Sequence, residues 1–133
     1  MIVLDTDAIS GLMRSRPAAT LVKHLEDVPL AEQATTAITL GEIAYGARRV
    51  GRSVLYDRAL RLLAGVRILD FDRVAAEQYG IVRTALEVSG RRLADPDLRI
   101  ASIVLAHRGT LLTGNVRHFG RVPGLQVVDW QGA

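Results

Sequence analysis

Short runs of contiguous apolar residues alternate along the chain with longer stretches in which apolar residues recur every three or four positions. Short apolar runs rich in β-branched residues are typical of strands that are buried on both faces. The run Ile2–Leu4 is the clearest of these. The pattern predicts strands at Met1–Thr6, Thr35–Thr39, Val66–Phe71, Thr110–Thr113 and Gln126–Asp129.

The stretches between these runs have the spacing of amphipathic helices. Asp72 is placed to cap the longest of them, and Gly90 to end it. The pattern predicts helices at Asp7–Arg14, from Pro17 to Val28, from Thr39 to Gly51, over Leu55–Leu63, after Asp72, and from Asp95 to Gly109. Because strands alternate with helices, we expect a single α/β domain over residues 1–133, with a mainly parallel sheet of four or five strands covered on both faces.

Composition narrows the function classes. The 133 residues suffice for one ordinary domain, and the absence of cysteine excludes disulfide scaffolds, thiol nucleophiles and sulfur-ligated zinc sites. No apolar run approaches the ~20 residues needed to cross a bilayer, and no basic segment precedes Asp5 as in a secretory signal. We therefore expect a cytoplasmic protein. The net charge of +3 is only a mild indication of a polyanionic partner.

Three acidic residues lie near the ends of predicted strands and helices, where parallel sheets bind their ligands. Asp5 ends the first predicted strand, Glu42 lies in the first turn after the second strand, and Asp97 begins the last long helix. In open α/β sheets, ligands bind outside the carboxyl ends of the strands, near the switch in strand order. These three positions are therefore candidates for one shared site.

Each acidic residue also has a purely structural interpretation. Asp5 or Asp7 would serve as the cap of the first helix, and the segment Thr39–Glu42 fits a capping box. The segment Asp95–Asp97 fits a capping aspartate followed by a proline and a second acid. Each interpretation accounts for its own segment taken alone.

Helix capping explains Asp97 less well, because its helix face also carries Ile100, Ala101 and Val104. A carboxylate before that apolar stripe points over the core, where an uncompensated charge is costly. Several converging carboxylates also repel one another. A divalent cation resolves both problems, and oxygen-only ligands suit Mg²⁺ or Mn²⁺.

Asn115 follows the fourth predicted strand, where its carbonyl oxygen would reach a metal ion or a bound water. A turn residue with positive φ is the alternative for this position. The three histidines, at positions 24, 107 and 118, form no evident catalytic pair, and His118 is nearest to the predicted site.

Four segments together resemble the PIN-domain family, and within it the VapC-type toxins of toxin–antitoxin pairs. The matching segments are Ile2–Asp7, Thr39–Gly46, Asp97–Ala101 and Leu112–Phe119, and the closing Arg121–Trp130 is similar to the usual ending of the family. Each motif is weak alone, but the four occur in the family's order along nearly the whole chain. The resemblance implies a three-layer α/β/α ribonuclease that requires Mg²⁺ or Mn²⁺.

The resemblance also assigns roles to residues. Asp5, Glu42 and Asp97 fall on the family's three acidic, metal-binding positions, and Asn115 falls on a fourth catalytic position that is often Asp. The missing charge at Asn115 implies that a second metal ion is held weakly, or only with substrate. Supporting hydroxyl positions match Thr6 and Thr113, whereas Asp95 matches no acidic position and is interpreted as the helix cap.

Metal chemistry predicts hydrolysis of RNA phosphodiesters to 5′-phosphate and 3′-hydroxyl ends without the ribose 2′-hydroxyl. We expect basic residues near the acidic positions to hold RNA phosphates, namely Arg14, Arg48, Arg49 and Arg117. The family resemblance further implies a homodimer and a VapB-type antitoxin as partner. Apolar residues of the first helices, Ile9, Leu12 and Met13, either contact that antitoxin or belong to the core.

Other functions remain open from the sequence. Asp5-Thr-Asp7 also resembles the opening motif of haloacid-dehalogenase-type phosphatases, but these enzymes and response-regulator receivers need a lysine near the later strands. Lys23 is the only lysine, and it lies too early in the chain. A degenerate PIN domain that binds RNA or a protein without cleavage is a further alternative, suggested by Asn115. The identity of the RNA and of the antitoxin cannot be read from the chain.

Overall fold

Five short strands form one parallel sheet in the computed structural model, which describes residues 1–131. The order across the sheet is β3-β2-β1-β4-β5, and all neighbours run parallel. The strands are β1 (Ile2–Leu4), β2 (Gln33–Thr36), β3 (Arg67–Leu69), β4 (Thr110–Leu112) and β5 (Gln126–Val128). The α/β class and the strand count agree with prediction, while the last two residues of the predicted 1–133 domain lie outside the described residues.

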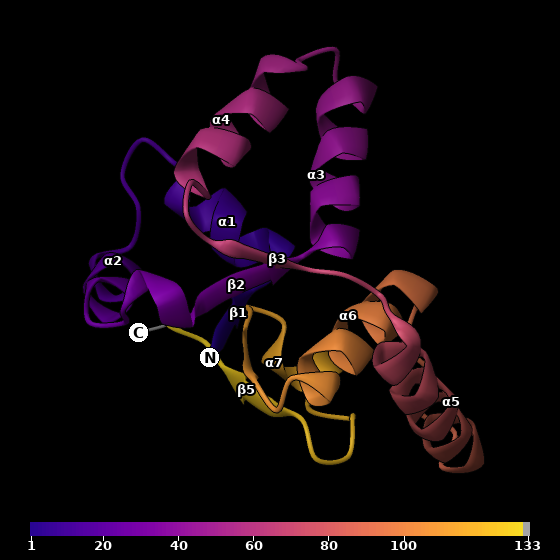
Figure 1. The fold of residues 1–133 in the computed structure, drawn as a ribbon. Coiled ribbons are helices and arrows are strands. Elements are labelled where there is room, and N and C mark those ends of the chain that lie inside the picture. Colours follow the sequence, from indigo (N-terminus) through magenta and orange to yellow (C-terminus); the bar gives the residue numbers. More distant parts are fainter. Residues whose placement is uncertain (132–133) are drawn as a thin grey trace.

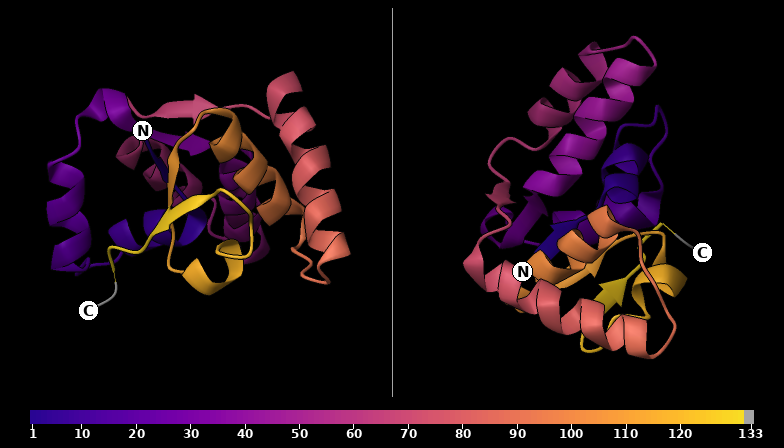
Figure 2. Two further views of the ribbon diagram at one scale, coloured as in Figure 1. Left: turned by 90° about the horizontal axis from the view of Figure 1, so that it is seen from below. Right: turned by 90° about the vertical axis from the view of Figure 1, so that its right-hand side faces the viewer.

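Seven α-helices and one 3₁₀ helix in residues 1–131 connect the strands and cover both faces of the sheet (Figure 1). The right-hand view of Figure 2 separates the layers, with α3 and α4 on one side of the strands and α5 and α6 on the other. The helices are α1 (Thr6–Leu12), α2 (Ala19–Glu26), η1 (Leu30–Glu32), α3 (Ala37–Arg49), α4 (Val54–Leu62), α5 (Arg73–Val88), α6 (Asp95–Ala106) and α7 (Val116–Phe119).

Alternate residues of the central strands face opposite layers, because successive side chains of a strand point to opposite faces. Val3 of β1 and Leu111 of β4 pack into the core beneath α5 and α6. Their neighbours Leu4 and Leu112 pack into the core shared with α1, α2 and α4. These four side chains are at most 2% exposed, which explains why both faces of the central strands β1 and β4 carry apolar residues at these positions.

The direction of chain progression across the sheet reverses between β1 and β4. The chain moves from β1 outward to β3, then crosses back through α5 and α6 to β4 on the other side of β1. Such a switch point leaves a crevice at the carboxyl ends of the two strands. The fold therefore provides a ligand site between the end of β1 and the end of β4.

The start of α3 differs from prediction. β2 ends at Thr36, and the hydroxyl of Thr36 accepts a hydrogen bond from the backbone N–H of Thr39 at 3.0 Å. Thr36 is thus the cap and Thr39 lies inside the helix, so the predicted capping box at Thr39–Glu42 is wrong. The strand predicted at Thr35–Thr39 exists, but it spans Gln33–Thr36. By contrast, Asp72 caps α5 as predicted, with its Oδ1 accepting from the N–H of Ala75.

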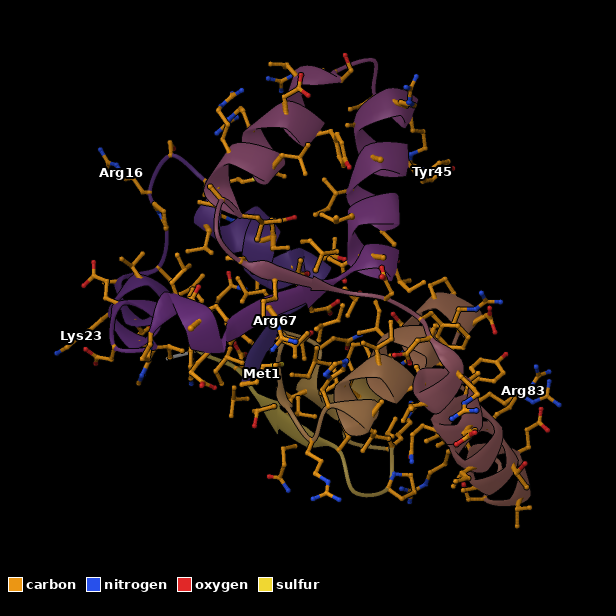
Figure 3. All side chains as sticks on the ribbon, in the orientation of Figure 1. Met1, Arg16, Lys23, Tyr45, Arg67 and Arg83 are labelled. Carbon is orange, nitrogen blue, oxygen red and sulfur yellow. The ribbon has the colours of Figure 1, made fainter. Side chains whose placement is uncertain are left out.

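Asp95 is also not a helix cap. It is the first residue of α6, and Ala94 occupies the cap position. Its carboxylate instead accepts a hydrogen bond from the hydroxyl of Tyr79 on α5 and pairs with Arg99 at 2.7 Å. Arg83, which projects from the outer side of α5 in Figure 3, donates to the same tyrosine oxygen. We call these four residues the Asp95 network; it holds the start of α6 against α5.

No helix within residues 1–131 is both long and apolar enough to cross a membrane. The segment after β5 returns to the first helices, where the ring of Trp130 stacks on His24 with centroids 4.9 Å apart. The carbonyl of Trp130 also accepts a hydrogen bond from the hydroxyl of Thr20. The end of the described chain is thereby attached to α2.

Candidate active site

Asp5 and Thr113 lie side by side at the switch point. Leu4 and Leu112 are register partners in β1 and β4, so the next residue of each strand emerges at the same edge of the sheet. The hydroxyl of Thr113 donates to Oδ2 of Asp5 at 2.9 Å. Asp5 is only 6% exposed, and although it occupies the cap position of α1, its side chain makes no capping hydrogen bond.

Glu42 reaches the same edge from α3, which packs against both α1 and α6. The hydroxyl of Thr6, directly after Asp5, donates to Oε1 of Glu42 at 3.0 Å. Because α3 begins at Ala37, Glu42 lies in its second turn rather than in the predicted first turn. This position directs its carboxylate toward α1 and not back to the helix start.

Asp97 enters from the first turn of α6 and is half-buried, with 26% of its side chain exposed. Its Oδ2 lies 3.0 Å from Nε2 of His118 on α7. Beyond it on the same helix, Ile100, Ala101 and Val104 are fully buried. Asp97 therefore stands where the apolar stripe of α6 meets the site.

Asp7 is not among the predicted site residues, yet it contacts the opposite side of the site. Its Oδ1 accepts from the hydroxyl of Thr113 at 3.1 Å, and its Oδ2 accepts from the backbone N–H of Gly114. The signals that could have found it are its position two residues after Asp5 and the glycine after Thr113. We call Asp5, Asp7, Glu42 and Asp97 the acidic cluster.

Burial and mutual repulsion distinguish these carboxyl groups from surface acids. The pKa of Asp5 is raised from 3.8 to about 7, mainly because burial disfavours its charged form, and in part because of Asp7. The pKa of Glu42 is also raised, by burial first and then by the charges of Asp97 and Asp7. The ion pairs found within residues 1–131 do not include Asp5, Asp7 or Glu42.

Asn115 and the predicted RNA-binding arginines are exposed but unequally placed. Asn115 precedes α7 with φ −97°, so it is not the positive-φ turn residue considered from the sequence. Arg117 lies two residues further on, in the single turn of α7. Arg48 and Arg49 lie in the last turn of α3, about 9 Å along the helix axis beyond Glu42. Arg14 lies beyond the end of α1.

The donor set of the acidic cluster fits a hard divalent cation. The four side chains of the cluster offer only carboxylate oxygens, although Nε2 of His118 contacts Asp97, and the buried Asp5 pairs with no basic side chain among residues 1–131. Within the described residues, no group of three acidic or histidine side chains is already arranged to hold an ion. The Asp97 carboxylate is turned to His118, and that of Glu42 to Thr6. Binding an ion would therefore have to draw these groups together.

An apolar groove of about 210 Å³ leads away from the acidic cluster between α1, α3 and α4. Thr6 and Glu42 stand at one end of it, and Met13, Ile43 and Leu55 contribute apolar walls. Of the helix residues predicted to contact a partner or the core, Ile9 is fully buried and belongs to the core. Leu12 and Met13 are only partly buried.

Comparison with known proteins places the chain in a family. The family model for the PIN domain matches residues 2–125. The tRNA(fMet)-specific endonuclease VapC of Shigella flexneri is 30% identical over 132 residues, 96% of each chain. Ribonuclease VapC2 of Rickettsia felis is 34% identical over 98 residues, 73% of each chain.

Solved structures agree with this assignment. The structure of VapBC2 from Rickettsia felis bound to a promoter DNA fragment contains a chain that matches with a TM-score of 0.85 and 31% identity, covering 98% of this chain and 99% of that one. VapBC-1 from Haemophilus influenzae matches with a TM-score of 0.84 and 31% identity, covering 99% and 100%. The chain with its acidic cluster at the β1–β4 switch point belongs to the PIN-domain family and, within it, to the VapC-type ribonucleases.

Proposed function

We propose that this protein is a Mg²⁺- or Mn²⁺-dependent endoribonuclease that acts in the cytoplasm as the toxin of a toxin–antitoxin pair. One observation carries the proposal. The buried carboxyl group of Asp5 lies beside Asp7, and its pKa is raised to about 7, at the edge of the sheet where the fold binds ligands and where Glu42 interacts with the charges of Asp97 and Asp7. An arrangement that destabilises its own charges is expected where a cation binds.

Asp5, Glu42 and Asp97 are the residues that would hold the ion, from the end of β1, the second turn of α3 and the first turn of α6. Thr113 and Thr6 fix the rotamers of Asp5 and Glu42 through the hydrogen bonds described above. When bound, Mg²⁺ lowers the pKa of a water molecule for attack on phosphorus and offsets charge on the phosphate. The amide of Asn115, at the mouth of the site, is available to hydrogen-bond water or the phosphate.

Positive charge is needed because an acidic cluster repels RNA. Arg117 is the arginine best placed to bind the phosphate at the cleavage position, since it lies only two residues beyond Asn115. Arg14, Arg48 and Arg49 would hold flanking phosphates farther along the chain of the RNA. Replacement of Arg117 by Gln should therefore reduce cleavage more than replacement of Arg48, while all four changes should weaken the salt dependence of binding.

A VapB-type antitoxin is the proposed partner, because solved relatives are VapBC complexes. The apolar groove from Leu55 to Thr6 and Glu42 offers an extended segment of that partner a path to the acidic cluster. A basic side chain at the end of such a segment would neutralise the carboxylates that the ion requires.

A homodimer is the second proposed assembly. Val74, Ile81 and Val88 form a stripe at seven-residue spacing along α5, and their exposed fractions are 46%, 64% and 84%. Such spacing places them on one side of the helix, as in the seam between paired helices. Light scattering of the wild type and of Ile81→Lys tests this, with a dimer expected only for the wild type.

The deciding experiment measures cleavage of total RNA by the purified protein with Mg²⁺, with chelator, and with Asp97→Asn. We expect cleavage that requires the metal, is lost in the variant, and leaves 5′-phosphate ends that ligate directly. Fragments ending in 2′,3′-cyclic phosphate would overturn the proposal, and would instead implicate the pair of His118 and Asp97 in activating the ribose 2′-hydroxyl. Metal-dependent RNA binding without cleavage would favour the degenerate binding domain.

A further inference from the structure

Asp7 connects two segments of the site that are far apart in the sequence. It lies in the first turn of α1, and its carboxylate accepts hydrogen bonds from Thr113 and Gly114 after β4. Gly114 permits this approach, because a Cβ at that position would lie 2.6 Å from Oδ2 of Asp7. A glycine at 114 thus lets the chain after β4 pass close to the Asp7 carboxylate.

Asp7 also belongs electrostatically to the acidic cluster. The single hydroxyl proton of Thr113 lies between two carboxylates, with Oδ2 of Asp5 at 2.9 Å and Oδ1 of Asp7 at 3.1 Å. Only one of them receives that proton at a time, so the two carboxyl groups compete for one hydroxyl donor, and Asp7 has the N–H of Gly114 as a second donor. The charge of Asp7 extends across the cluster to Glu42.

The adjacent position on the β4 side carries no charge. Asn115 follows Gly114 directly, is exposed, and makes no capping hydrogen bond with its side chain. Its backbone N–H donates to the hydroxyl of Thr113, the same oxygen that contacts Asp7. The backbone N–H of Asn115 and the carboxylate of Asp7 therefore contact the same hydroxyl group, and the side chain at position 115 brings no charge to that place.

From this geometry we infer that Asp7 supplies the fourth carboxylate charge of the cation site, in place of a charge at position 115. The inference rests on the proposed metal-dependent function and adds a residue to it. Carboxylate count is a main determinant of divalent-cation affinity in oxygen-ligand sites. Asp7 is a positioning and charge-supplying residue in this proposal, with Asp5, Glu42 and Asp97 as the ligands.

A merely structural role would make a different prediction. If Asp7 serves only to hold Gly114 and Thr113, an asparagine at position 7 keeps an acceptor oxygen and preserves that attachment. If its charge matters, the same substitution weakens cation binding although the attachment survives. The Asp7→Asn variant separates the two roles because it changes charge with almost no change in shape.

The experiment measures Mn²⁺ binding by titration calorimetry and by the electron paramagnetic resonance signal of free Mn²⁺, without RNA. Four proteins are compared: the wild type, Asp7→Asn, Asn115→Asp, and the double variant carrying both changes. We expect Asp7→Asn to weaken Mn²⁺ binding about 10–100-fold, and the double variant to recover most of that loss. Asp95→Asn, outside the acidic cluster, is the matched control and should bind as the wild type does.

The possible outcomes are distinct. Equal Mn²⁺ affinity of Asp7→Asn and the wild type would overturn the inference and leave the proposed nuclease intact. Failure of Asn115→Asp to restore binding to a folded Asp7→Asn protein would also overturn it, in favour of the purely structural role. No Mn²⁺ binding by the wild type would instead refute the metal-dependent function itself, and the role of Asp7 with it. Circular dichroism verifies that each variant is folded.

Discussion

The acidic cluster and the Asp95 network each include an aspartate from the first turn of α6, Asp97 and Asp95 respectively. The surroundings of the two groups nevertheless have opposite effects on carboxylate charge. Asp95 lies between Tyr79 and Arg99, and the hydrogen bond from Tyr79, followed by the contact with Arg99, lowers its pKa. Asp5 is buried beside Asp7, and its pKa is raised to about 7. The fold thus gives Asp95, which holds the start of α6, partners that stabilise its charged form. It gives Asp5, at the switch point, surroundings that disfavour its charged form.

This difference separates structural from functional acids without reference to motif. A carboxylate whose partners lower its pKa stabilises the folded protein, whereas one whose surroundings raise it destabilises the folded protein at neutral pH. Uncompensated buried charge persists where a ligand is to complete the site.

The largest expected effect is on cleavage. Asp97→Asn should reduce the rate of RNA cleavage by at least about 100-fold, because it removes a charge that faces the bound cation and phosphate. Asp95→Asn makes the same chemical change on the same helix, but its side chain points to Tyr79 and Arg99. We expect its rate to stay close to that of the wild type, and equal losses in the two variants would contradict the distinction.

The next effect is on stability, and its sign follows from the raised pKa of Asp5. The folded protein holds a proton on Asp5 up to about pH 7, whereas the unfolded chain releases it near 3.8, so the folded state loses stability as pH rises between these values. Asp5→Asn removes this loss. Without metal, we expect the variant to be more stable than the wild type by about 2–4 kcal/mol at pH 8, with a much smaller difference near pH 4.

Urea denaturation of both proteins at several pH values, in the presence of chelator, measures this difference. Groups remote from Asp5 behave alike in both proteins, so their contributions cancel in the comparison. A destabilised Asp5→Asn protein at pH 8, or a difference that does not change with pH, would show that Asp5 is not the strained group.

Mg²⁺ should reduce the difference in stability between the wild type and Asp5→Asn, because it stabilises the wild type. Binding to the folded state alone stabilises the wild type by about 1.4 kcal/mol at a concentration tenfold above its Kd, which raises the Tm by roughly 3–6 °C. Asp5→Asn should show little or no shift, whereas Asp95→Asn should shift as the wild type does. Thermal denaturation with and without Mg²⁺ tests this, and equal shifts in all three proteins would place the ion elsewhere.

Much of the fold was predictable because it depends on local patterns. Apolar runs locate β1, β3, β4 and β5, whereas β2, with the sequence Gln-Ala-Thr-Thr, begins two residues before the predicted strand. Asp72 caps α5 as its position indicates. Boundaries were less predictable where two hydroxyl residues competed, since Thr36 and not Thr39 caps α3. The short helices η1 and α7 were missed, because one turn carries too little periodicity to be recognised.

The site was less accessible to sequence reasoning because its contacts join distant segments. Asp5, Glu42 and Asp97 were identified by their places at element ends, and the structure brings them to one edge of the sheet. The contact of Asp7 with Gly114 spans 107 positions, and that of Tyr79 with Asp95 spans 16. Side chains near a helix start have several possible acceptors, and only the packing of α1 beside β4 and of α5 against α6 selects among them.

The smallest expected effect is on the free energy of unfolding when the Asp95 network is changed. Tyr79→Phe removes the hydroxyl that donates to Asp95 and accepts from Arg83, but keeps the ring against Phe71, with centroids 5.9 Å apart. Since Asp95 is half exposed, solvent screens much of its interaction with the network. We expect a loss of about 0.5–1 kcal/mol in unfolding free energy at neutral pH, reduced by salt.

The pH dependence of this loss should have the opposite sign to that of Asp5→Asn. The pKa of Asp95 is lowered in the folded state, so its contribution to stability is present above the ordinary aspartate pKa and is lost as pH falls through the lowered value. The difference between wild type and Tyr79→Phe should therefore shrink in acid, whereas Asp5 weakens the fold as pH rises toward neutrality. If urea denaturation gave both variants the same pH slope, tertiary contacts would not be what separates Asp95 from Asp5, and the assignment of one to packing and the other to catalysis would fail.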